Sequence, residues 1–149
     1  TTGINVSPNF SPDGHTLAFT SDRSGTPQIY TMSLEGGSAK RITYSGNYNT
    51  TPAISPSADT IAYQSREGGR FDIFTIPIGG GTPTQQTDGR GTNENPSWSP
   101  DGRYLAFSST RAGHAHIYIL QIESHKIIAP LTEDNGNDTV PAWSWWLGD

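Results

Sequence analysis

The sequence predicts an all-β fold built from repeated four-stranded units, and two observations carry that prediction. The first is a repeat, because a Pro-x-x-Ser segment begins at Pro8, recurs at Pro52 and Pro96, and starts again at Pro141. The steps are 44, 44 and 45 residues. The second is that the apolar stretches are short and have apolar residues at successive positions. A period of about 40 to 50 residues filled with short strands is typical of the blades of a β-propeller.

The first strand of each unit, strand A, is expected around Phe10, Ile54 and Trp98. We expect the proline of each repeat to open this strand, since proline lacks an N–H and is tolerated at a first strand residue or on a sheet edge. Strand A would therefore be the inner edge that faces a central channel. A Ser-Pro-Asp-Gly turn follows in the first and third units, whereas Ala58 replaces the glycine in the second. A left-handed alanine costs about 1 kcal/mol, so we expect a different turn there.

The next two strands are expected to be buried on both faces. Strand B covers residues 16–21, 60–65 and 104–109, and strand C covers 28–34, 72–78 and 116–122. Leu17 and Phe19 point to one face and Ala18 to the other, whereas a sheet with one wet face alternates apolar and polar residues. The more polar strand D lies near 39–43, 83–87 and 127–132. No apolar stripe has a helical period, so we predict no helix.

The repeat predicts one structural unit over residues 1–149. Its blades cover about 7–45, 51–89 and 95–134, and an extra inner strand covers about 140–145. Between strand B and strand C, Gly25 aligns with Gly69 and Gly113, and a threonine closes each unit at Thr43, Thr87 and Thr132.

Composition excludes several function classes. The net charge is −5 with no basic cluster, so nucleic acid is not an expected partner. The chain has no cysteine, which excludes disulfides and thiolate chemistry, and no apolar run is long enough for a membrane span. It starts at Thr1 without an apolar leader, so we expect a processed chain or an excised segment.

The repeated motif resembles a known family. The pattern Pro-x-aromatic-Ser-Pro-Asp-Gly, then Leu-Ala-Phe, then Ser/Thr-x-Arg-x-Gly, then Ile-Tyr and a closing Thr is similar to the WD-like repeats of TolB-like propellers. The third unit fits best, while the second departs at Ser57-Ala58 and at Arg66-Glu67. The segment from Pro141 to Ser144 is similar to the family's C-terminal strand, but Trp145-Trp146-Leu147 departs from it.

The resemblance implies several properties. TolB-like propellers have six blades and work in the periplasm at the bacterial envelope, where they bind protein partners such as a Pal-like lipoprotein. Three blades leave two apolar faces open, so a homodimer that completes six blades is expected. The two candidate inner strands, at 8–11 and 141–144, then compete for places. The family also implies a possible calcium ion in the channel on strand A carbonyls.

The loops between strand D and the next strand A are the candidate partner site. They precede equivalent strands, so they are expected to converge at one mouth of the channel. Asn and Thr side chains offer donors and acceptors, and one tyrosine offers an aromatic anchor. The alternative is that Asn-Gly pairs there only favour left-handed turns. The candidate residues are Tyr48, Asn49, Thr51, Asn93, Glu94, Asn95, Asn137 and Asp138.

Other constellations point to no dedicated chemistry. His114 and His116 would lie on one face of a strand, as zinc ligands do, but no third ligand lies nearby in the sequence, so an exposed turn is the expected alternative. The acidic residues near Asp134 fit no calcium-loop spacing. No Gly-x-Ser-x-Gly, His-Glu-x-x-His or phosphate-loop motif occurs, so no catalytic residue and no side-chain metal site are expected.

Three functions remain open. The first is a non-catalytic scaffold for protein–protein interaction at the cell envelope. The second is a regulatory propeller segment of an oligopeptidase-like enzyme. The third is an engineered or excised half-propeller without a cellular partner. An α/β-hydrolase domain in the parent gene would decide for the second.

Overall fold

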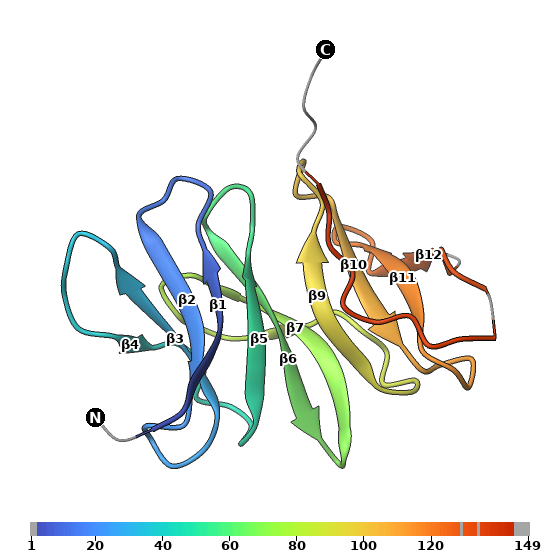
Figure 1. Ribbon diagram of the computed structural model, residues 1–149, viewed down its shortest axis with the longest axis horizontal. Helices are drawn as coiled ribbons and strands as arrows, with labels where there is room; N and C mark the ends of the chain where they lie inside the picture. The colour runs from blue at the N-terminus through green and yellow to red at the C-terminus, as the bar shows by residue number, and fades with distance from the viewer. Residues whose placement is uncertain (1–2, 129, 134, 145–149) are drawn as a thin grey trace.

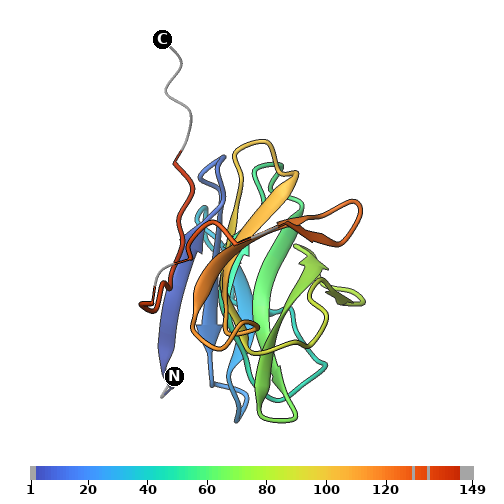
Figure 2. The same cartoon turned by 90° about the vertical axis from the view of Figure 1, so that its right-hand side faces the viewer.

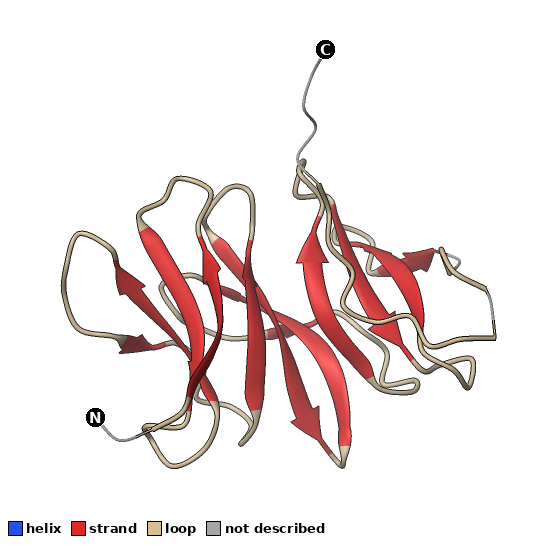
Figure 3. Ribbon diagram, in the orientation of Figure 1, coloured by secondary structure: helices blue, strands red, loops and turns tan. Residues whose placement is uncertain are grey.

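The computed structural model describes residues 3–128, 130–133 and 135–144, and within them the chain forms strands and loops without helix (Figure 3). No helix that could cross a membrane is therefore present in those residues. The strands form three four-stranded antiparallel sheets. The sheets stand side by side along an arc (Figure 1), and a view turned by 90° looks from the third sheet along this arc (Figure 2). The predicted all-β, partial propeller is confirmed.

Each sheet is one blade, with its strands in chain order from the inner to the outer edge. Blade 1 contains β1 (Asn5–Phe10), β2 (Thr16–Ser21), β3 (Gln28–Ser33) and β4 (Lys40–Arg41). Blade 2 contains β5 (Asn49–Ile54), β6 (Thr60–Glu67), β7 (Arg70–Pro77) and β8 (Thr84–Gln85). Blade 3 contains β9 (Asn93–Trp98), β10 (Tyr104–Ser109), β11 (His116–Gln121) and β12 (Lys126–Ile128).

The hydrophobic core lies between the blades. The first core cluster joins Ala18, Ile29 and Ile42 of blade 1 to the facing side of blade 2, including Ile61 and Tyr63. The second joins Ala62 and Ile73 of blade 2 to the equivalent side of blade 3, where Leu105 and Phe107 are fully buried. Leu17 and Phe19 occupy the matching positions of blade 1. There they lie on the face at the end of the arc, which no described blade covers.

The repeat predicts that its prolines open strand A, and this prediction is wrong because the prolines lie inside the strand. β1, β5 and β9 each begin three residues before their proline. The pairing with strand B shifts register at this point in all three blades. Each proline therefore lies at a β-bulge, where its missing N–H costs no ladder hydrogen bond.

The turn at Ala58 is also unlike the prediction. Ala58 has φ 56° and takes the left-handed position that Gly14 and Gly102 occupy in the other blades. The N–H of Ala58 donates to the carbonyl of Ser55 at 2.9 Å, as in the two glycine turns. The Ala58 side chain packs against the first core cluster, and this contact offsets part of the backbone strain.

Candidate functional site

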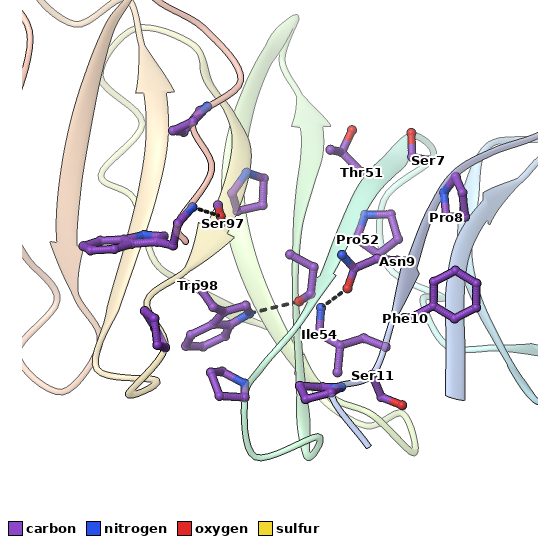
Figure 4. A pocket seen from close by; sticks show the side chains of 17 residues that line it. Ser7, Pro8, Asn9, Phe10, Ser11, Thr51, Pro52, Ile54, Ser97 and Trp98 are labelled. Atoms are coloured by element: carbon purple, nitrogen blue, oxygen red, sulfur yellow. Dashed lines mark hydrogen bonds between the residues drawn. The ribbon is translucent and has the colours of Figure 1, made fainter. Parts of the chain in front are cut away.

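The channel side of the blades carries a groove lined by strand A residues and by the turns that follow them (Figure 4). Its volume is about 580 Å³. Its lining residues include prolines, small polar side chains and the large apolar groups of Phe10, Ile54, Trp98 and Trp143. None of the described residues that line the groove is ionisable. Apolar surface with a few polar groups is the usual lining of a binding site.

The groove is held in shape by bonds from one blade to the next, all of which end on strand A. The Asn9 side-chain oxygen accepts the N–H of Ile54 at 2.8 Å, and the indole N–H of Trp98 donates to the carbonyl of Ala53 at 2.9 Å (Figure 4). Trp143 occupies the next equivalent position, and its N–H donates to Ser97 Oγ at 3.3 Å. The inner strands are therefore tied into one wall.

The backbone before each channel proline is strained. Ser7, Thr51, Asn95 and Val140 all have φ between 52° and 56°, and each directly precedes the proline of its repeat. Positive φ is rare for any residue with a side chain and is unfavourable for the β-branched Thr51 and Val140. The N–H groups of Thr51 and Asn95 bond to Thr20 Oγ1 and Gln64 Oε1 of the preceding blade. Repeated strain of this kind occurs at binding sites, where the surrounding fold maintains it.

A buried polar network fixes the loops that lead into strand A. In blade 1 the Thr43 hydroxyl donates to Gln28 Oε1 at 2.7 Å, and the Asn49 side-chain amide donates to the same oxygen at 2.9 Å. In blade 2 Thr87 and Asn93 bond in the same way to Asp72 Oδ1, at 2.5 and 2.9 Å. The donors of this network all bond to one side chain of strand C in each blade, so the network positions the loop, although the buried Oδ1 of Asn49 has no hydrogen-bond partner among the described residues.

The structure separates the eight predicted site residues. Asn49 and Asn93 are fully buried in the network just described. The Tyr48 ring packs edge-on against Phe71, and the Arg66 guanidinium lies 4.5 Å from its centroid. Thr51 lines the groove. Glu94 and Asn95 are partly exposed beside it, Asn137 is exposed and Asp138 is partly buried.

Around the candidate site, one carboxyl has a shifted pKa and one histidine lies close to a carboxylate. Burial raises the pKa of the Glu94 carboxyl above its ordinary value. His116 is buried, and its Nδ1 lies 3.6 Å from Asp138 Oδ2, whereas His114 is exposed. The exposed turn expected for both histidines is therefore wrong for His116. Within the described residues, no group of three or more His, Asp or Glu side chains is placed to hold a metal ion.

Sequence reasoning assigned strand A to the channel but missed its aromatic and proline side chains as the groove lining. It selected polar loop residues because mixed donors and acceptors suggest recognition. The signal that could have found the groove is the repeat itself, since a large apolar residue of strand A recurs at Phe10, Ile54, Trp98 and Trp143.

The propeller fold agrees with the comparisons with known proteins. The model of the TolB β-propeller domain matches residues 1–90, which is more than half of the chain. The chain belongs to the TolB β-propeller domain family. Among solved structures, a putative TolB from Agrobacterium tumefaciens superposes with a TM-score of 0.86 at 28% identity, over 93% of this chain and 50% of that one. TolB from Acinetobacter baumannii gives a TM-score of 0.80 at 28% identity, over 95% and 35%.

Two kinds of curated relative share a short stretch with this TolB-domain chain. The Tol-Pal system protein TolB of Bordetella pertussis is 62% identical over 37 residues, or 25% of this chain and 8% of that protein. The uncharacterized peptidase YuxL of Bacillus subtilis is 60% identical over 37 residues, or 24% of this chain and 6% of that protein. The chain thus matches less than a tenth of these relatives and half or less of the two TolB structures.

Proposed function

We propose that this chain is a non-catalytic β-propeller scaffold that binds protein partners at the bacterial cell envelope, in the periplasm. The observation that supports it most is the groove on the channel side, which combines aromatic and proline surface with a repeated strained backbone and has no ionisable lining residue. The relatives named Tol-Pal system protein TolB support a Pal-like partner, and the resemblance of the repeats to TolB-like propellers implies the periplasm and a lipoprotein. A ring of six blades, completed by a second copy, would turn the groove into a channel.

The partner is proposed to sit at the mouth of this channel. The loops that precede β5 and β9 lie at one end of the inner strands, and the turns that follow β1, β5 and β9 lie at the other end (Figure 1). Pro12, Pro56 and Pro100 of these turns line the groove. Because Asn49 and Asn93 are buried, the contacts would come from the accessible members of the predicted set: Tyr48, Thr51, Glu94, Asn95, Asn137 and Asp138. A channel cation stays a prediction, and backbone carbonyls of strand A would have to hold it.

Calorimetric titration with the periplasmic domain of a Pal-like lipoprotein tests the proposal. Replacing Tyr48 and Glu94 together by alanine should weaken binding by roughly tenfold or more, since anchor residues at an interface cost about 1–2 kcal/mol each when truncated. The control is Glu123→Ala, an exposed acid in the turn between β11 and β12. Unchanged affinity in the double variant would place the site elsewhere, and absence of binding by the unaltered chain would reject this partner.

A second candidate function is a regulatory propeller segment of a peptidase, and the match to YuxL favours it. The propeller of the Trilobed protease from Pyrococcus furiosus has a TM-score of 0.71 at 17% identity, which supports the fold alone. In this case the catalytic groups would belong to another domain. An α/β-hydrolase domain encoded in the same reading frame would decide for it.

A further inference from the structure

We propose that His116 and Asp138 form a pH-dependent contact that holds residues 137–144 against blade 3. Protonation of His116 strengthens this contact, and loss of the proton weakens it. The inference goes beyond the proposed function. It does not depend on the partner proposed at the channel mouth, because it concerns contacts within the chain alone.

In the first two blades, the residue at the start of strand C is bonded to the next inner strand by a side-chain amide. Gln28 Oε1 accepts the side-chain amide of Asn49 at 2.9 Å, and Asp72 Oδ1 accepts that of Asn93 at 2.9 Å. An amide keeps its hydrogens at any pH at which the chain is folded. The donor in these two contacts therefore does not depend on pH.

The equivalent contact of blade 3 joins two ionisable groups. The Asp138 N–H donates to the carbonyl of Ala115 at 2.7 Å, as that of Asn49 donates to Pro27 at 2.9 Å, so Asp138 occupies the equivalent place. The residue at the start of strand C is here His116, which is buried. Its Nδ1 lies 3.6 Å from Asp138 Oδ2. Both atoms are buried and have no hydrogen-bond partner among the described residues.

A proton on the imidazole supplies the bond that is missing. Neutral imidazole carries a hydrogen on one of its two nitrogens, whereas imidazolium carries one on each. Protonated His116 therefore presents an N–H to Asp138 Oδ2, and the pair can close to a charge-assisted hydrogen bond of about 2.8 Å. The closed contact binds this proton more tightly than the open one. It is favoured at a pH below the range in which imidazole titrates, and it is lost as the pH rises through that range.

The other ionisable groups of the neighbouring elements are paired elsewhere, exposed or on other rows of the sheet. They are Asp72, Asp88 and Arg111 at the junction with blade 2, Glu94 on β9, Lys126 on β12, and His114 and Glu133 on the adjoining loops. Arg111 forms an ion pair with Asp88 at 3.4 Å, and His114 and Glu133 are exposed. The carboxylate at 3.6 Å is therefore the charge that responds to the imidazole of His116.

The contact fixes a segment that contributes to the groove. Trp143 lines the groove, and its N–H donates to Ser97 Oγ at 3.3 Å. The Asn137 side-chain oxygen accepts the N–H of Ala115 at 3.0 Å. Asp138 lies between these two attachments in the chain. Protonation of His116 therefore fixes this side of the groove, and loss of the proton loosens it.

The chain itself supplies a matched replacement for the pair. His116→Gln with Asp138→Asn copies the contact between Gln28 and Asn49, which contains no ionisable group. Hydrogen exchange of the backbone amide at position 138 is measured by NMR at about pH 5 and about pH 8, which bracket the titration of imidazole. The amide of Asn49 makes the equivalent bond to Pro27, so the ratio of the two protection factors cancels intrinsic rates and changes of the whole fold.

In the unaltered chain this ratio should be about tenfold higher at the lower pH, since a hydrogen bond to a charged group contributes about that factor. The double variant should show the same ratio at both pH values. Asp138→Asn alone should lose most of the pH dependence, because an amide can accept from protonated imidazole and donate to neutral imidazole. Glu133→Gln is the control that removes an exposed carboxylate of the same loop, and it should keep the dependence.

Two results would overturn the proposal. The first is an equal ratio at both pH values in the unaltered chain. The second is a pH dependence that persists in the double variant or disappears in Glu133→Gln, because another group would then carry it.

Discussion

Single carboxylates hold the turns between strand A and strand B. Asp101 Oδ1 accepts the Ser99 hydroxyl at 2.6 Å and the N–H of Arg103 at 3.1 Å. These hydrogen bonds, with the Arg103 guanidinium, lower the pKa of Asp101 to about 2. Asp13 occupies the same place in blade 1 and its pKa is lowered by the Ser11 hydroxyl. In blade 2 Asp59 takes over this role, and the Ser57 hydroxyl lowers its pKa in the same direction.

This lowering predicts how stability depends on pH. A carboxyl whose folded-state pKa lies below its ordinary value of 3.8 stabilises the folded chain above about pH 4, and this contribution is lost as the pH falls toward about 2. The urea midpoint should therefore decrease over that window. Asp101→Asn should flatten the decrease, whereas Glu123→Gln should leave its slope unchanged. Identical pH profiles for all three proteins would show that these turns do not contribute.

At the scale of the elements, the blades are held by apolar burial between them and by one threonine within each. Phe107 is fully buried between blades 2 and 3 and lies 6.0 Å from Tyr118, measured between ring centroids. Thr43 accepts the N–H of Ile29 and donates to Gln28, so it joins strand C to the loop after strand D. The first contact holds neighbouring blades together and the second holds a blade to its own loop.

Phe107→Ala should reduce the free energy of unfolding by roughly 3–5 kcal/mol, because it removes a buried ring between two sheets. Urea unfolding followed by tryptophan fluorescence measures the loss. Tyr44→Ala is the control, since Tyr44 is 73% exposed. A loss below about 1 kcal/mol in the Phe107 variant would mean that the blades do not stack as described.

Thr43→Val should cost about 1–3 kcal/mol, because the buried N–H of Ile29 and the Gln28 side chain both lose a partner. Thr132→Val is a matched comparison, since in the described residues the Thr132 hydroxyl has one hydrogen bond, from the N–H of Ile117. The second substitution should therefore cost less. The prediction fails if the order of the two is reversed in the same urea experiment.

At the scale of the whole molecule, three blades leave an apolar surface at each end of the arc. Association that buries both surfaces couples folding to concentration. The melting temperature measured by differential scanning calorimetry should therefore be higher at about 100 μM protein than at about 1 μM. A concentration-independent melting temperature would indicate a monomer.

The sequence by itself determined the blade architecture. A period of 44 residues with apolar positions at Leu17, Ile61 and Leu105 can be satisfied only when sheets stack, so the strands and their order follow from local pattern. Strand B was predicted within two residues in every blade. The family followed from the same repeat, because the first and third units carry the motif and the second departs from it only at Ser57-Ala58 and Arg66-Glu67.

Tertiary structure decided which polar residues are buried and which turns are left-handed, because both depend on what lies next to each residue in space. Pattern places Asn49 and Asn93 in polar loops, yet neighbouring side chains bury both within their blades. Ala58 takes the left-handed turn because its methyl group gains core contacts that propensity ignores. Asp138 and Asn93 are similar residues at equivalent positions, but only the fold shows that Asp138 Oδ2 is buried without a hydrogen-bond partner, 3.6 Å from His116 Nδ1, whereas Asn93 bonds to Asp72 and Arg111.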